Sequence, residues 1–334
     1  MKRINEIVSD IKSGNIKPIY FLMGEEPYYI DKISDYIEQN VLSEEEKEFN
    51  QVVLYGRDVT IDDIVSNAKR YPMMADRQVV IVKEAQDLSR TIENLLSYVE
   101  NPQPTTVLVI CYKYKLLDKR KKLSKSISKN GLLFESKKLY DNQVGDWIRR
   151  VLAGKGFQIE PKAAIMLVEF LGTDLSKIAN ELEKLMSILP KESTIRPVDV
   201  EVNIGISKDF NNFELQNAIG EKKLVKANQI INYFADNPKN NSLVLTITLL
   251  NKYFTKLLIY HGLTNKSKGN VVKALGISAY FYDDYVIAAR NYPMRKVSQI
   301  ISYLRDTDVK SKGVGANAAD TRDLLKELIF KIMH

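Results

Sequence analysis

The stretch YPMMADRQVVIV (residues 71–82) joins a turn to a β-branched strand. A helical spacing of apolar residues precedes it and ends at Arg70, and Pro72 disfavours helical backbone at Tyr71. The run of residues 79–82 is typical of a buried strand. Two adjacent methionines, Met73 and Met74, are therefore predicted to lie on a turn between a helix and a strand.

Two interpretations of Met73 and Met74 compete at this point. Methionine usually packs inside a protein, so both side chains could fill gaps beneath the edge of the strand. Alternatively, they are two unbranched apolar side chains presented on a surface turn to a pocket of a partner. The turn alone does not decide between these interpretations.

Strands and helices alternate through the first 140 residues. Thr60 and Asp63 have the spacing of a capping box, which predicts a helix start there. The alternation predicts a parallel sheet covered by helices on both faces. We expect strands over 18–23, 49–55, 77–82, 105–112 and 132–136, and helices over 4–11, 30–41, 60–70 and 88–99.

The strand signal disappears after about Asp141, and helical periodicity follows. Three helices are predicted over 144–152, 161–171 and 175–189, followed by a polar, irregular linker over 191–208. Further helices are predicted over 213–219, 224–234, 243–260, 279–289, 297–309 and 321–333. These patterns divide the chain into an α/β domain (1–140), a three-helix domain (141–208) and an all-helical domain (209–334).

Composition excludes several classes of protein and site. The 334 residues contain no long uninterrupted apolar run, and the first ones begin an amphipathic helix, so we expect a cytoplasmic protein without a membrane span. Cys111 is the only cysteine and lies in an apolar strand pattern, which predicts a buried, inert thiol. His261 and His334 are the only histidines. We therefore expect no disulfide, metal centre or histidine-based catalytic triad.

The net charge of +7 comes from one segment, residues 115–138, which holds nine Lys or Arg and two acidic residues. The rest of the chain has forty residues of each sign. One interpretation is a solvated helix face, which charge runs usually form. The other is non-specific contact with DNA phosphates, for which the candidate residues are Lys119, Arg120, Lys121, Lys122 and Lys125.

A phosphate-binding loop is missing where an α/β domain should carry one. The turn after the first strand begins at Gly24, so a P-loop would need Gly, Lys and Ser or Thr at the positions of Tyr29, Ile30 and Asp31. A magnesium ligand would require an acidic residue directly after an apolar strand, but Lys83 follows the third strand. Glu84 is expected to be a solvated loop residue. The sequence predicts a P-loop-like scaffold with neither a catalytic nor an ATP-binding site.

Four segments of the chain resemble the delta subunit family of the bacterial DNA polymerase III clamp loader. The third is the most specific, because its LGTDL and NELEKL elements occur at the family's spacing. In the family's motif at the turn, a Leu-Phe pair is followed by Ala, a small or polar residue, Arg and Gln. Met73 and Met74 stand in place of the pair, and Ala75, Arg77 and Gln78 match. The four segments are residues 19–27, 71–82, 171–185 and 304–311.

The resemblance implies an AAA+-like first domain that does not bind ATP, a three-helix second domain and a helical collar that joins other loader subunits. It further implies that the turn binds the sliding clamp (beta) and holds it open through Pro72, Met73, Met74 and Arg77. The implied partners are the clamp, the loader ATPase subunits, delta-prime and primed DNA. No cofactor is implied. Taken with the resemblance, the presented-pair interpretation of the methionines is the one we expect.

Two other functional classes remain as alternatives. A P-loop-like ATPase or kinase would have to bind nucleotide despite the residues at 29–31. A stand-alone nucleic-acid-binding protein is suggested by the basic segment and by the aromatic and basic residues around 280–296. Salt-dependent binding of the isolated chain to DNA would favour the latter.

Overall fold

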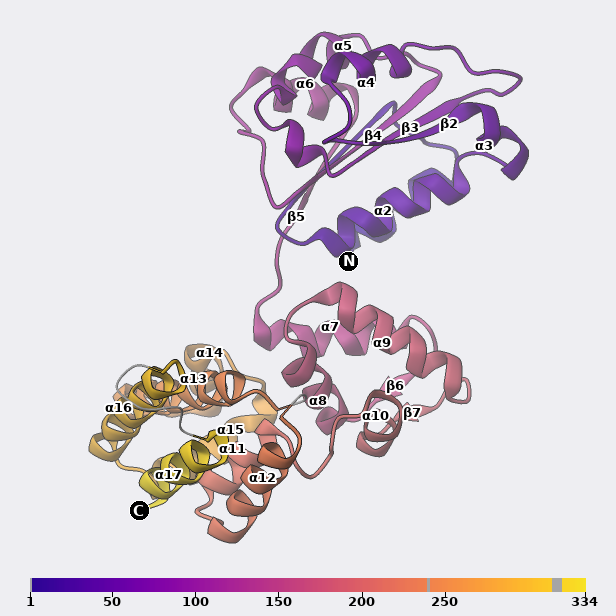
Figure 1. Cartoon of the computed structure of the whole chain (residues 1–334). Helices are drawn as coiled ribbons and strands as arrows, with labels where there is room; N and C mark the ends of the chain where they lie inside the picture. The colour runs from indigo at the N-terminus through magenta and orange to yellow at the C-terminus, as the bar shows by residue number, and fades with distance from the viewer. Residues whose placement is uncertain (1, 239–240, 314–319) are drawn as a thin grey trace. The chain divides into compact units, whose positions relative to one another are not determined.

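The computed structural model describes residues 2–238, 241–313 and 320–334 and divides into two units, Met1–Leu139 and Tyr140–His334 (Figure 1). Unit 1 contains a five-stranded parallel sheet in the order β2-β3-β4-β1-β5. The strands are β1 (Ile19–Gly24), β2 (Gln51–Tyr55), β3 (Gln78–Lys83), β4 (Thr106–Lys113) and β5 (Leu132–Ser136).

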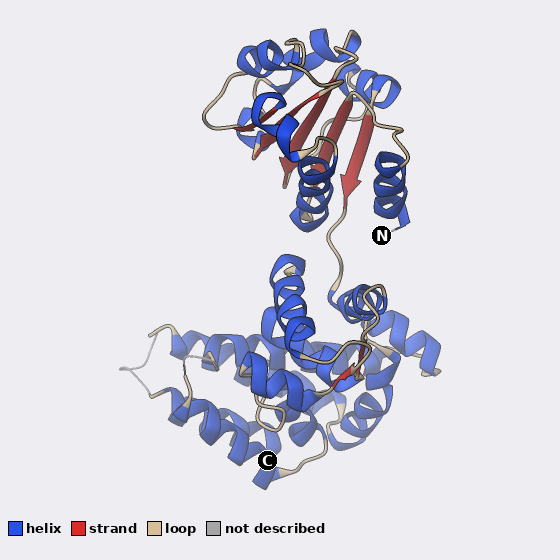
Figure 2. Ribbon diagram, turned by 90° about the vertical axis from the view of Figure 1, so that its right-hand side faces the viewer, coloured by secondary structure: helices blue, strands red, loops and turns tan. Residues whose placement is uncertain are grey.

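Helices cover both faces of this sheet (Figure 2). One face packs against α2, which itself contacts α1, and the other packs against α4, α5 and α6. Because both faces are covered, β1, β3 and β4 are almost continuously buried and apolar, as expected for a parallel sheet. The helices of unit 1 are α1 (Lys2–Lys12), α2 (Pro27–Asn40), α3 (Glu44–Asn50), α4 (Ile61–Ala68), α5 (Leu96–Glu100) and α6 (Lys122–Asn130), with short 3-10 helices η1 (Ala85–Leu88) and η2 (Ile92–Leu95).

Local signals explain where several of these elements begin. The predicted capping box at the start of α4 is confirmed: the Thr60 hydroxyl accepts from the Asp63 N–H at 3.2 Å, and the Asp63 carboxylate accepts from the Thr60 N–H at 2.9 Å. The predicted strand over 49–55 was too long. Residues 49 and 50 belong to α3, which begins with a second capping box formed by Ser43 and Glu46.

Unit 2 is largely helical. Its helices are α7 (Asp141–Ala153), α8 (Pro161–Leu171), α9 (Leu175–Ile188), α10 (Pro197–Ile204), α11 (Asn212–Gly220), α12 (Leu224–Asp236), α13 (Leu243–Gly262), α14 (Lys268–Leu275), α15 (Tyr282–Asn291), α16 (Met294–Ser311) and α17 (Thr321–Met333), with the 3-10 helix η3 (Ala279–Phe281). The predicted fold class, a parallel α/β domain followed by a largely helical remainder, is confirmed.

Several details of the helical prediction were wrong. The helix predicted over 88–99 is η2 followed by α5, and α14 was not predicted. The segment 191–208 is not an irregular linker, because it contains α10 and the short strand β7 (Thr194–Ile195). β7 pairs in parallel with β6 (Gln158–Ile159), a contact that local periodicity does not reveal.

Helix α8 contacts the start of α11 through polar groups. The Glu169 carboxylate accepts a hydrogen bond from the Phe213 N–H at 2.9 Å, and Lys162 forms a 2.8 Å ion pair with Glu214. From α11 onward, buried residues of α11 to α17 form one apolar core. This core includes the inner face of α13, which among the described helices is the one long and apolar enough to cross a membrane by length and composition alone.

Candidate functional site

The turn between α4 and β3 exposes both methionines. Met73 is 59% exposed and Met74 is fully exposed, and Tyr71 beside them is 77% exposed. The interpretation of Met73 and Met74 as core residues was therefore wrong. Pro72 and Arg77 are half-buried on the same turn, so the four candidate residues for clamp contact lie on one short connection.

Gln78 anchors one end of this turn. Its side chain is buried, and its amide nitrogen donates to the carbonyl oxygens of Arg70 (2.5 Å) and Asn67 (3.2 Å) and to the Thr106 hydroxyl (2.8 Å). The Gln78 side chain thus ties the start of β3 to the last turn of α4 and to the residues that follow it. The glutamine that matched the family's motif thus holds the turn from inside.

A second anchor, Asn50, was missed by sequence reasoning. This asparagine is 4% exposed at the end of α3, and its side-chain amide forms hydrogen bonds with both the N–H and the carbonyl of Met73. Asn50 lies 23 residues before Met73, so helical or strand periodicity gives no signal for this contact. The turn is therefore held on both sides, with its apolar side chains pointing into solvent.

The basic candidate residues lie before and on α6, and four of the five have acidic partners. Lys119 pairs with Glu135 at 2.5 Å, Arg120 with Asp118 at 2.9 Å, Lys121 with Glu93 at 3.2 Å and Lys122 with Glu100 at 2.7 Å. The hydrogen bonds from Arg120 are the main cause that lowers the pKa of Asp118 to about 2. Lys125 is exposed. This pairing partly neutralises the local positive charge, and exposed ion pairs of this kind contribute little to stability.

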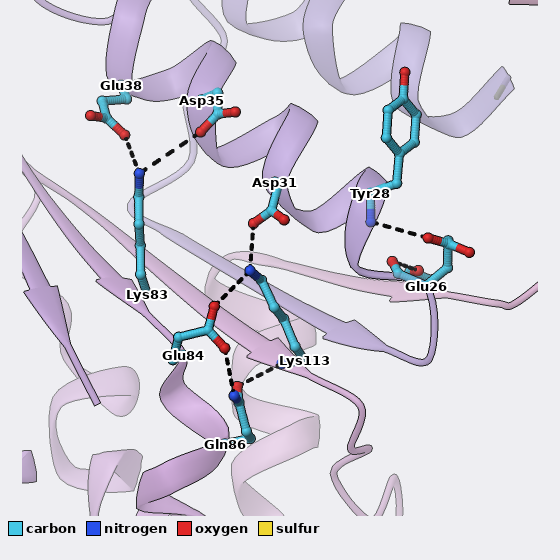
Figure 3. Close-up of polar contacts among 10 residues, drawn as sticks. Glu26, Tyr28, Asp31, Asp35, Glu38, Lys83, Glu84, Gln86 and Lys113 are labelled. Carbon is cyan, nitrogen blue, oxygen red and sulfur yellow. Dashed lines mark hydrogen bonds and ion pairs between the residues drawn. The ribbon is translucent and has the colours of Figure 1, made fainter. Parts of the chain in front are cut away.

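The connection from β1 to α2, where a P-loop would lie, is closed. α2 begins at Pro27, so only Glu25 and Glu26 separate it from the strand, and the buried Glu26 side chain caps the helix by accepting from the Tyr28 N–H at 3.2 Å (Figure 3). The Ser136 hydroxyl donates to the Glu26 carbonyl, and the Glu25 N–H donates to the Ser136 carbonyl at 3.1 Å. Backbone N–H groups that would cradle a phosphate in a P-loop are thus used within the protein.

The carboxyl edge of the sheet, where α/β folds bind nucleotides, contains an ion-pair cluster. Lys113, at the end of β4, lies between Asp31 on α2 (2.9 Å) and Glu84 after β3 (2.7 Å) (Figure 3). Burial alone would lower the pKa of Lys113, but hydrogen bonds and charge attraction from Glu84 and Asp31 outweigh it and raise the pKa. Glu84 lies in the loop after β3, as predicted, with its side chain 39% exposed, but the ion pair with Lys113 was not predicted.

A second ion-pair cluster lies beside the first. Lys83, at the end of β3, pairs with Glu38 at 2.9 Å and with Asp35 at 3.9 Å, both on α2 (Figure 3). Both lysines that end central strands are thus held by carboxylates of α2. A triphosphate at this edge would compete with carboxylates for each lysine and meet their negative charge.

Metal-ligating and nucleophilic side chains of the described part of the chain bear on other kinds of chemistry. There, no group of three or more His, Cys, Asp or Glu side chains could hold a metal ion. Cys111 is buried in β4, as predicted, and this burial is the main cause that raises the pKa of its thiol to about 12. Such a thiol stays protonated at neutral pH and is a poor nucleophile.

The fold and this site define a parallel α/β domain with a closed phosphate loop and an exposed apolar turn, followed by a largely helical chain. The family model described as DNA polymerase III, delta subunit, matches residues 20–137. The DNA polymerase III subunit delta of Bacillus subtilis (strain 168) is 30% identical over 254 residues, covering 73% of this chain and 72% of the relative.

A solved structure agrees with this assignment. The DNA clamp loader delta protein of Bacillus subtilis (YqeN) superposes with a TM-score of 0.60 at 25% identity, covering 99% of both chains. The chain belongs to the DNA polymerase III delta subunit family.

Proposed function

We propose that this chain binds the sliding clamp and opens it for loading onto primed DNA, without hydrolysing ATP itself. The observation that carries the proposal is the exposure of Met73 and Met74 on a turn anchored by Asn50 and Gln78. Adjacent exposed apolar side chains on a pinned turn have the form of a short binding motif that enters a hydrophobic pocket. Methionine is flexible enough to fill a pocket that accepts Leu or Phe.

The mechanism needs no bond chemistry in this chain. A subunit that binds an open ring more tightly than a closed one shifts the opening equilibrium by the difference between the two affinities. ATP binding by partner subunits would then determine when the turn is free to engage. Its role in the DNA polymerase III holoenzyme is thus one of assembly rather than catalysis.

Clamp opening is tested with a cognate clamp whose ring interface is closed by an engineered disulfide. We expect the isolated chain to bind the oxidised, locked ring at least about tenfold more weakly than the same ring after reduction, because only the reduced ring can open. Titration calorimetry in both states measures the difference. Equal affinities would refute opening while leaving clamp binding in place, whereas no binding in either state would refute both.

The absence of ATP binding is a separate expectation. Asp31 and Glu84 hold Lys113, and the β1–α2 connection is too short to surround a phosphate. Titration of the isolated chain with magnesium-ATP should show no specific heat of binding, with a loader ATPase subunit as the positive control. Micromolar affinity that ADP competes away would contradict this and favour the ATPase or kinase alternative.

We assign the helical remainder to assembly with the loader ATPase subunits and delta-prime. Its core is complete from α11 to α17, yet exposed apolar side chains remain on its surface, including Val225 (74%) and Phe330 (62%). Helix-helix contacts between subunits would cover such side chains. The domain boundaries at 140 and 208 remain predictions, as does the cytoplasmic location of the assembly.

Contact with primed DNA within the assembly is also proposed, through Lys119, Arg120, Lys121, Lys122 and Lys125. The exposure of Lys125 and the weakness of exposed ion pairs support it. The acidic partners of the other four residues support the alternative, a solvated helix face. They also weaken the case for a stand-alone nucleic-acid-binding protein, because less of the local charge is unpaired.

A further inference from the structure

The side chain of Asn50 holds the backbone of the first exposed methionine on both sides. Its amide oxygen accepts from the Met73 N–H at 2.6 Å, and its amide nitrogen donates to the Met73 carbonyl at 2.9 Å. The same nitrogen donates to the Glu46 carbonyl in α3 at 3.1 Å. A buried primary amide can supply an acceptor and two donors at once, and Asn50 uses all three.

Asn50 is itself rigidly placed. α3 is fixed at its start by the capping box of Ser43 and Glu46. The residue after Asn50 begins β2 and is paired in register with Val79 of β3. The turn is therefore tied to the sheet twice, through Gln78 at the start of β3 and through Asn50 at the start of the neighbouring strand.

This second tie matters because the turn is strained at its tip. Met74 has a φ of 53°, in the left-handed region that side chains other than glycine rarely adopt. Such conformations persist where surrounding contacts determine them, and they cluster at functional sites. The two hydrogen bonds from Asn50 fix the peptide groups on both sides of Met73, the second of which leads into Met74.

We propose that Asn50 is a positioning residue for partner binding, which presents Met73 and Met74 as a preformed pair without touching the partner. This inference rests on the proposed function, because the partner is the sliding clamp. A preformed turn avoids the entropy of ordering a loop during association, so its loss weakens binding even when every contacting side chain is kept.

The test compares Asn50→Ala and Asn50→Asp with the parent chain. Alanine removes all three hydrogen bonds, whereas aspartate keeps an acceptor for the Met73 N–H and loses the donors. We expect clamp affinity to fall by about tenfold for alanine and less for aspartate. Amide hydrogen exchange, measured without clamp, should show a protected Met73 N–H in the parent and faster exchange in Asn50→Ala.

Asn130→Ala is the matched control. The Asn130 amide also holds backbone from another element, donating to the Val99 carbonyl at 2.8 Å, but its hydrogen bonds go to α5 and not to the turn. We expect this variant to lose comparable stability while retaining parental clamp affinity and exchange at Met73. An equal loss of affinity in Asn130→Ala would overturn the inference, because the Asn50 effect would then reflect general destabilisation.

A double-mutant cycle separates positioning from direct contact. In a Met73→Ala, Met74→Ala background, Asn50→Ala should cause little further loss of clamp affinity, since there is no pair left to present. A full additional loss would overturn the proposal, as would unchanged exchange at Met73 in Asn50→Ala. If the parent chain itself does not bind the clamp, the proposed function fails, and the exchange measurement still decides whether Asn50 holds the turn.

Discussion

The Met73→Ala, Met74→Ala double variant is expected to lose clamp binding while unfolding at nearly the same temperature as the parent. Truncating a hot-spot side chain costs roughly 2 kcal/mol or more of binding free energy, which is about thirtyfold in affinity for one residue. Both side chains are exposed, so their removal should change the free energy of unfolding by about 0.5 kcal/mol or less. Titration with the clamp and thermal unfolding measure the two quantities.

Met294→Ala is the control for a general effect of removing exposed methionines. Met294 is 51% exposed at the start of α16 in unit 2, so the variant should bind the clamp as the parent does. The double variant should also still co-purify with the other loader subunits. A large drop in melting temperature, with clamp affinity per folded molecule intact, would show that the clamp contact lies elsewhere.

Glu169→Gln is expected to stabilise the chain at pH 8 and to flatten the dependence of its stability on pH. Burial, and secondarily the nearby Glu214 carboxylate, raise the pKa of Glu169 to about 8, although the hydrogen bond from the Phe213 N–H acts in the opposite direction. Between the ordinary pKa of a glutamate and pH 8, the folded state holds a proton that the unfolded state has released. We therefore expect the contribution of Glu169 to stability to fall as pH rises through this interval, by at most about 1.4 kcal/mol per pH unit.

Glutamine keeps an oxygen to accept from the Phe213 N–H and carries no charge, so the gain at pH 8 should be on the order of 2 kcal/mol. Denaturant unfolding at several values between pH 5 and pH 8 measures it. Glu192→Gln, which removes an exposed carboxylate, should leave the pH profile unchanged. A parental slope that persists in Glu169→Gln would assign the pH dependence to other groups.

The sheet could be predicted from sequence because its central strands are nearly continuous apolar runs between turn signals. Elements that depend on contacts between distant residues could not. β6 and β7 are two-residue strands that exist only because residues 158–159 pair with residues 194–195. The start of β2 was misplaced because Phe49 is apolar, whereas the capping box at Ser43 and Glu46 places residues 49 and 50 in a helix.

In the candidate site, too, the features with a local sequence signal could be predicted and those that depend on distant contacts could not. The apolar turn could be predicted from Pro72 and the methionine pair alone. The lack of a P-loop could be predicted from the residues at positions 29–31. The ion pairs of Lys113 with Asp31 and Glu84 at the carboxyl edge of the sheet could not be predicted, because these residues come together only when the sheet forms. The contact of Asn50 with Met73 could not be predicted either, because it joins residues 23 positions apart and a single asparagine produces no periodic pattern.

The closed β1–α2 connection limits how nucleotide binding could be engineered into this chain. Gly24 has a φ of 133°, and a Cβ at this position would lie 1.9 Å from the Ser136 carbonyl oxygen, while the Gly24 carbonyl accepts from the Tyr114 N–H at 2.8 Å. The connection is thus locked between β5 on one side and the end of β4 on the other. Substituting Lys and Thr at positions 30 and 31 would place them inside a helix that has already begun. A phosphate cradle of the P-loop type would take an insertion between Gly24 and Pro27 together with release of the Ser136 contacts, so point substitutions alone would not create one.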